Sequence, residues 1–245
     1  MVFIDSVNNI GVKFMIEKLF MYIHDFIETT EYSNIKISEP EIAFVNDIKE
    51  CIMVDDPEYS DRIKGNPSGV FYISSTNLPY LLILRTDEMD AIWQTIYHEM
   101  IHYYDFYMYS IESNIIDYRK LQDDTFFVFW SEFHADYLSW KYIYNKYKSL
   151  IVPINEANNI INDVEIFLKN NRYLHDVINH LVRRYGQYMA FCDVFPDVAE
   201  KCQIKWLYIN RYFSSLYCFL SENTTYSLFS QKKDIWESLL CSYEK

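Results

Sequence analysis

Two histidines and a glutamate in one short segment have the residue types and the spacing of a metal site. His98, Glu99 and His102 form the pattern H-E-x-x-H. On a helix, residues four apart lie on the same face, so the imidazoles of His98 and His102 can reach one zinc ion. Glu99 lies one position further round the helix, where its carboxylate can hold a water molecule on that ion. The pattern is typical of zinc-dependent hydrolysis.

A catalytic zinc ion takes three protein ligands, and the third is expected on a separate element that packs against the first helix. Glu132 lies 30 residues after His102, in a second helical segment. On that helix Glu132 shares a face with Asp136, whereas His134 points about 200° away from Glu132. Residues 130–137 are therefore the candidate source of the third ligand, with Glu132 and Asp136 on one face and His134 as the alternative to Glu132 if the helix is rotated.

The order H-E-x-x-H and then, on a later helix, E-x-x-A-D resembles the gluzincin metallopeptidases. The resemblance covers about residues 78–140, and it implies that Glu132 is a zinc ligand and that Asp136 orients a ligand histidine. The strand before the motif, the short gap and the compact size are similar to small cytoplasmic members such as the ImmA/IrrE-type peptidases. Those peptidases often have Gly where this chain has Ile101. Their DNA-binding partner domain has no counterpart here, so the resemblance implies no role in repressor cleavage.

The expected reaction is hydrolysis of a peptide bond in a peptide or protein substrate. Zinc lowers the pKa of its water towards 7 and polarises the scissile carbonyl. Glu99 is expected to accept the proton of that water and to deliver it to the leaving amine. Asp136 is expected to accept a hydrogen bond from a ligand imidazole, which fixes the tautomer of the ring.

Two other classes of function are consistent with the same residues. One is a non-catalytic zinc-binding interaction domain that retains the H-E-x-x-H site. The other is a metal-free helical scaffold in which the motif is coincidental. Glu99 favours an enzyme over the first alternative, because a purely structural zinc site does not need that carboxylate.

Some further polar residues are weaker candidates. Asp105 lies seven residues after His98 on the same stripe, and it is either a partner of a ligand or a solvated or capping carboxylate. A peptidase also needs a donor for the oxyanion of its tetrahedral intermediate. The candidates share one helical segment and are His175, His180, Arg183, Arg184 and Tyr185.

Helices are expected to position these residues. Apolar residues at helical spacing predict a first helix over residues 12–29, a helix that carries H-E-x-x-H, and a helix over residues 125–149. From residue 154 the pattern is helical almost to the end, with interruptions at 170–171, at Pro196 and at 221–225. Short apolar runs at 35–37, 51–54, 70–74 and 80–84 are separated by turn signals and predict a small sheet.

The composition agrees with this pattern, because 4 Gly and 6 Pro are too few for the turns of an all-β fold. The predicted fold class is α+β and mainly helical, with a small antiparallel sheet beside the H-E-x-x-H helix and the second ligand helix. We expect a single domain over residues 1–245. The sheet and the active-site helices occupy about 35–150, and a helical C-terminal part occupies about 154–245.

The net charge and the cysteine content limit which classes of partner and which cellular compartment are expected. The net charge is −13 and no basic stripe is present, so nucleic-acid binding is not expected. The sequence contains no run of 18 apolar residues, so no membrane span is predicted. Residues 1–20 lack the pattern of a signal peptide. The five cysteines are an odd number without a C-x-x-C pair, which predicts reduced thiols and a cytoplasmic location.

Overall fold

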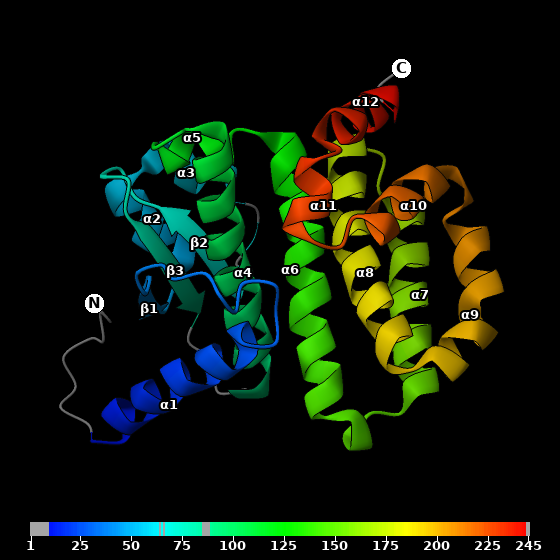
Figure 1. The fold of residues 1–245 in the computed structure, drawn as a ribbon, viewed down its shortest axis with the longest axis horizontal. Coiled ribbons are helices and arrows are strands. Elements are labelled where there is room, and N and C mark those ends of the chain that lie inside the picture. The colour runs from blue at the N-terminus through cyan, green and yellow to red at the C-terminus, as the bar shows by residue number, and fades with distance from the viewer. Residues whose placement is uncertain (1–9, 64, 66, 85–88, 244–245) are drawn as a thin grey trace. The chain divides into compact units, whose positions relative to one another are not determined.

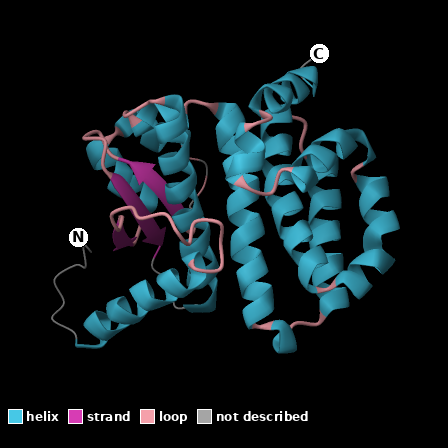
Figure 2. Cartoon of the chain, viewed as in Figure 1, coloured by secondary structure: helices cyan, strands magenta, loops and turns pink. Residues whose placement is uncertain are grey.

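The computed structural model describes residues 10–63, 65, 67–84 and 89–243. Its contacts divide the chain into two compact units, Met1–Asp123 and Asp124–Lys245. All the strands lie in the first unit, and the described residues of the second unit are helices and loops (Figure 2). The predicted class, α+β and mainly helical, is confirmed. Residues 1–9 of the segment inspected for a signal peptide lie outside the described residues.

The sheet has three strands: β1 (Glu41–Val45), β2 (Gly69–Ile73) and β3 (Pro79–Leu84). The order is β1-β3-β2, so β3 is central. The predicted antiparallel pairing holds for β2 and β3, which form a hairpin. It does not hold for β1, which pairs in parallel with β3. The chain reverses once between β1 and β2, through a connection that contains two helices (Figure 1), and again in the β2–β3 hairpin, so β3 runs in the same direction as β1.

Two of the four predicted strands are not strands. Residues 35–37 form no strand, and residues 51–54 lie in α2 (Ile48–Asp55). Ile48 and Ile52 are both buried, four residues apart, which is the helical period. Asp47 caps this helix by accepting a hydrogen bond from the Glu50 amide. The predicted turn at 55–57 is the break between α2 and α3 (Pro57–Arg62).

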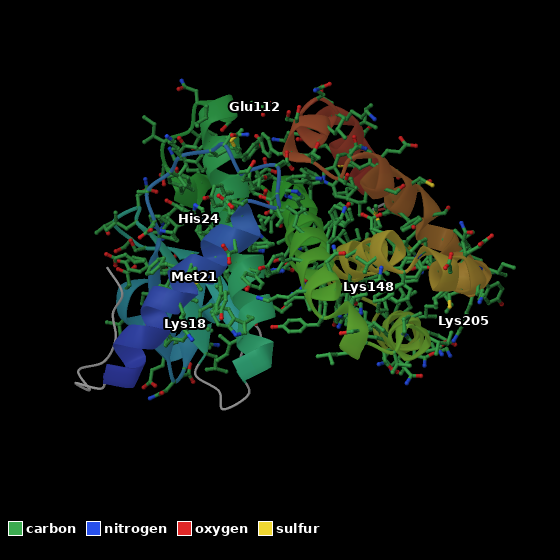
Figure 3. All side chains as sticks on the ribbon, turned by 60° about the horizontal axis from the view of Figure 1, so that its bottom comes forward. Lys18, Met21, His24, Glu112, Lys148 and Lys205 are labelled. Atoms are coloured by element: carbon green, nitrogen blue, oxygen red, sulfur yellow. The ribbon has the colours of Figure 1, made fainter. Side chains whose placement is uncertain are left out.

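Besides α2 and α3, the described residues of the first unit form the helices α1 (Ile10–Ile27), α4 (Met89–Ser113) and α5 (Tyr118–Gln122). Helix α4 carries the H-E-x-x-H segment and packs on β2, β3 and α1. The apolar face of α1 contacts α4, where the Phe26 and Tyr97 rings lie 4.6 Å apart. The opposite face of α1 is exposed and carries Lys18, Met21 and His24 (Figure 3).

The second unit is built on α6 (Thr125–Lys146), which lies beside α8 (Leu174–Val194) in a close helix pair (Figure 1). The remaining helices pack around this pair: η1 (Lys148–Leu150), α7 (Pro153–Asn170), α9 (Pro196–Ile209), η2 (Arg211–Phe213), α10 (Ser214–Glu222), α11 (Tyr226–Ser230) and α12 (Lys233–Tyr243). The predicted interruptions at 170–171, Pro196 and 221–225 all coincide with helix ends. Helix α6, grouped in the sequence analysis with the sheet region, belongs to the second unit.

No described helix is long and apolar enough to cross a membrane.

Candidate metal centre

The two histidines of α4 converge on one point. The His98 and His102 side chains are buried, and their Nε2 atoms lie 3.0 Å apart. The rings meet edge to face, with centroids 4.6 Å apart. Zinc–nitrogen bonds of about 2.0–2.1 Å place two tetrahedral ligand atoms roughly 3.3 Å from each other. The spacing of the two Nε2 atoms is therefore close to that of two ligands of a single metal ion.

Glu99 is fixed by the neighbouring strand. Its Oε2 accepts a hydrogen bond of 2.6 Å from the Phe71 amide of β2. In this hairpin the Leu84 amide bonds to the Ser68 carbonyl, and Val70 pairs with Leu82. Hydrogen-bonded pairs alternate along an antiparallel ladder, so the Phe71 amide points away from β3 and can donate to Glu99. One carboxylate oxygen is thus held by the backbone, which orients Oε1 as well.

The strand reaches Glu99 because β2 begins with a glycine. A Cβ atom at Gly69 would lie 2.3 Å from Thr95 Cγ2 and 3.2 Å from Glu99 Cγ. These two atoms leave no room for a side chain at Gly69. The absence of a Cβ therefore lets β2 approach α4 closely at this point.

Asp105 is fully buried, which rules out the interpretation as a solvated carboxylate. It accepts a hydrogen bond from the hydroxyl of Tyr32, and the Tyr32 ring stacks on Tyr104 with centroids 5.1 Å apart. The buried carboxylate therefore fastens the segment after α1 to α4. Its role as a partner of a ligand histidine stays a prediction.

The predicted carboxylates of α6 share one cation. Arg183 of α8 donates from Nε to Asp136 Oδ2 at 3.0 Å, and the same nitrogen lies 3.5 Å from Glu132 Oε2. The Asp136 side chain is only 6% exposed, whereas that of Glu132 is 21% exposed. The guanidinium thus hydrogen-bonds the more buried acid and lies near the more exposed one.

A mid-helix glycine brings α8 this close to α6. A Cβ at Gly186 would lie 2.4 Å from the Phe133 carbonyl oxygen, 2.8 Å from the Tyr137 nitrogen and 3.1 Å from Asp136 Cβ. Since Arg183 and Gly186 are three residues apart, they lie on the same side of α8. The close backbone approach therefore places the guanidinium beside the two acids.

The predicted ligands are divided between the two units. His98 and His102 belong to the first unit and Glu132 to the second, and the three side chains together are a candidate donor set for a metal ion. Two imidazoles and a carboxylate are donors that suit zinc. His134, the alternative ligand, is buried within the second unit, where its ring stacks on Trp130 with centroids 4.6 Å apart.

The candidate oxyanion donors of α8 have other contacts. His180 stacks on Phe167, and its Nε2 lies 3.0 Å from Asp163 Oδ2. Burial lowers the pKa of His180 to about 4, in spite of that carboxylate. Arg184 bonds the same Asp163 oxygen.

The other two donors differ in burial. Tyr185 is buried and bonds the side chain of Asn210, and burial raises its pKa well above 10. His175 is exposed beside Asp176.

Comparisons of the chain with family models, with curated proteins and with solved structures give no match.

Two contacts of the predicted site residues were not predictable from the sequence. One is the Phe71 amide, because a backbone donor leaves no trace in residue type. The other is the double contact of Arg183, which depends on residues 47 and 51 positions away. Gly69 and Gly186 were the residues that could have indicated these close approaches of β2 to α4 and of α8 to α6. Glycine is scarce in this chain, and at both positions a side chain has no room.

Proposed function

We propose that this protein is a zinc-dependent peptidase whose metal ligands are His98, His102 and Glu132. The observation that carries the proposal is the pair of buried imidazoles with Nε2 atoms 3.0 Å apart, beside a glutamate that a strand amide holds in place. The chemistry of the donor set supports it, because two imidazoles and one carboxylate are ligands that suit a catalytic zinc ion.

Three protein ligands leave a coordination position open for water or substrate. When bound, zinc lowers the pKa of a coordinated water towards 7 and polarises a carbonyl oxygen. The imidazoles of α4 are buried and share one helix, so their separation is set before any ion binds. This preorganisation favours a site for a single ion.

Glu99 is the proposed general base. Because its Oε2 accepts from the Phe71 amide, Oε1 is the oxygen that takes the proton of the attacking water. The same oxygen then delivers that proton to the nitrogen of the leaving amine.

Asp136 is proposed to support the ligands by accepting a hydrogen bond from one ligand imidazole as well as from Arg183. Losing such a partner lowers metal affinity or activity by roughly 10- to 100-fold. A competitive zinc titration of Asp136→Asn should show a shift of that size. An unchanged affinity would remove Asp136 from the site.

The direct test is Glu99→Gln, which keeps the size of the side chain and removes its basicity. The variant should bind zinc as the parent does, while cleavage of a peptide library read by mass spectrometry falls by roughly 10²- to 10⁴-fold. Chelation should abolish cleavage by the parent, and added zinc should restore it. Chelator-sensitive cleavage that survives Glu99→Gln would contradict the role of Glu99. A parent that binds zinc and cleaves no peptide would favour a non-catalytic zinc-binding interaction domain.

We further propose a cytoplasmic location, with peptides or proteins as substrates and without nucleic-acid or membrane partners. All five cysteines are free thiols: Cys51, Cys192, Cys202, Cys218 and Cys241. Protein from its native host, denatured and alkylated without reductant, should gain five alkyl groups by mass. Stable disulfides would contradict the location.

A further inference from the structure

Two carboxylates on α6 are able to serve as metal ligands. Glu132 and Asp136 are four residues apart, so they lie on the same face of the helix. A second carboxylate that joined the three protein ligands and the water would raise the coordination of the ion from four to five and crowd the water of a catalytic site. The structure must therefore contain something that keeps one of the two acids away from the ion.

We propose that Arg183 is a positioning residue that holds Asp136 and so reserves Glu132 for the metal ion. The inference rests on the proposed metal site, and it adds a reason why the site has three protein ligands. Arg183 itself touches neither substrate nor metal in this role.

The contacts of the guanidinium discriminate between the two acids. Nε donates a hydrogen bond to Asp136 Oδ2 at 3.0 Å, whereas its contact with Glu132 Oε2 at 3.5 Å is an ion pair without a hydrogen bond. A charge-assisted bond of this kind is about twice as strong as a neutral one. Asp136 is thus held more firmly, and Glu132 can turn to an ion at a smaller cost.

Burial strengthens this difference. The Asp136 side chain is nearly inaccessible, so its charge depends on protein partners, and Arg183 supplies a full positive charge.

The backbone fixes the position of Arg183 itself. Gly186, one turn further along α8, faces the Phe133 carbonyl and the Asp136 Cβ without room for a Cβ of its own. The distance between α8 and Asp136 is therefore set by backbone contact and not by the flexible arginine side chain. Without the guanidinium, the Asp136 carboxylate would lose its cationic partner. A metal ion bound to Glu132, one helical turn from Asp136, could then replace the guanidinium as that partner.

Cobalt(II) reports the number of ligands, because its visible absorption weakens when coordination rises from four to five or six. The full-length protein is stripped of metal and loaded with cobalt(II) alone. The Arg183→Gln variant should lose most of the visible absorption of the parent, since Asp136 joins the ion. The double variant Arg183→Gln/Asp136→Asn should recover it. Arg184→Gln is the matched control, because Arg184 bonds Asp163 instead, and its spectrum should equal that of the parent.

Three results would overturn the inference or its basis, and they are distinguishable. A parent that binds no cobalt(II) or zinc refutes the proposed function itself. A folded, cobalt-loaded Arg183→Gln variant with the spectrum of the parent refutes the role of Arg183 alone. A loss of absorption that persists in the double variant also refutes it, because Asp136 is then not the added ligand.

Far-UV circular dichroism establishes whether Arg183→Gln is folded. If it is not, Arg183→Met takes its place, because methionine keeps a long, unbranched side chain but has neither the charge nor a donor. The loss of absorption is then expected in the same direction, and parental intensity in that variant overturns the proposal.

Discussion

The substitution Gly186→Ala tests the close packing of α6 and α8 that positions the acids. The new Cβ would lie 2.4 Å from the Phe133 carbonyl oxygen and 2.8 Å from the Tyr137 nitrogen. Both are backbone atoms, so no side-chain rotation relieves the overlap. The helices must separate locally by about 1 Å to reach ordinary contact at 3.4 Å.

Two effects of opposite sign decide the outcome. Overpacking of this kind costs about 1–3 kcal/mol, and contact with backbone favours the upper end. Replacing a mid-helix glycine by alanine gains about 1 kcal/mol of helix propensity. The free energy of unfolding should therefore fall by about 2 kcal/mol, whereas propensity alone would raise it.

Urea unfolding followed by tryptophan fluorescence measures this change well, because four of the five tryptophans lie in the second unit. Asn159→Ala on the exposed face of α7 is the control for helix propensity, and it should change stability by only a few tenths of a kcal/mol. A Gly186→Ala protein as stable as the parent, or more stable, would refute the packing argument.

Two further predictions concern buried polar groups. Tyr32→Phe removes the hydroxyl that donates to the buried Asp105 carboxylate, and it should cost about 1.5–3 kcal/mol in urea unfolding; a loss below about 0.5 kcal/mol would show that the bond contributes little. Burial lowers the pKa of His180 from 6.5, the value of a solvated histidine, to about 4 in the folded protein. Between pH 4 and 6.5 the unfolded chain therefore binds a proton that the folded protein does not. The free energy of unfolding falls as the pH falls through this range. The slope from this residue reaches about 1.4 kcal/mol per pH unit, and His180→Phe should show a correspondingly flatter pH dependence of unfolding; identical slopes in parent and variant would contradict the burial of a neutral imidazole.

The helices were predictable because their signals are local. The 3.6-residue period fixed α4 and α6, and Pro196 and the asparagines at 170–171 marked helix ends. The same reasoning failed at 51–54, because a short apolar run fits a strand as well as one face of a helix. The parallel pairing of β1 with β3 was not predictable either, since it is set by a distant part of the chain.

The candidate site shows the same division. His98, Glu99 and His102 follow from one local motif, and the pairing of the two imidazoles follows from helix geometry. The amide that holds Glu99 and the arginine beside Asp136 come from other elements, and the sequence does not show which surfaces meet.

Metal content shows whether His98, His102 and Glu132 hold a zinc ion. Protein purified without added metal should carry about one zinc ion per chain by elemental analysis. His98→Ala, His102→Ala and Glu132→Ala should each remove most of it, and His134→Ala should retain it. Protein that is folded but neither carries nor binds zinc would contradict the account, and so would a site that loses its metal in His134→Ala and keeps it in Glu132→Ala.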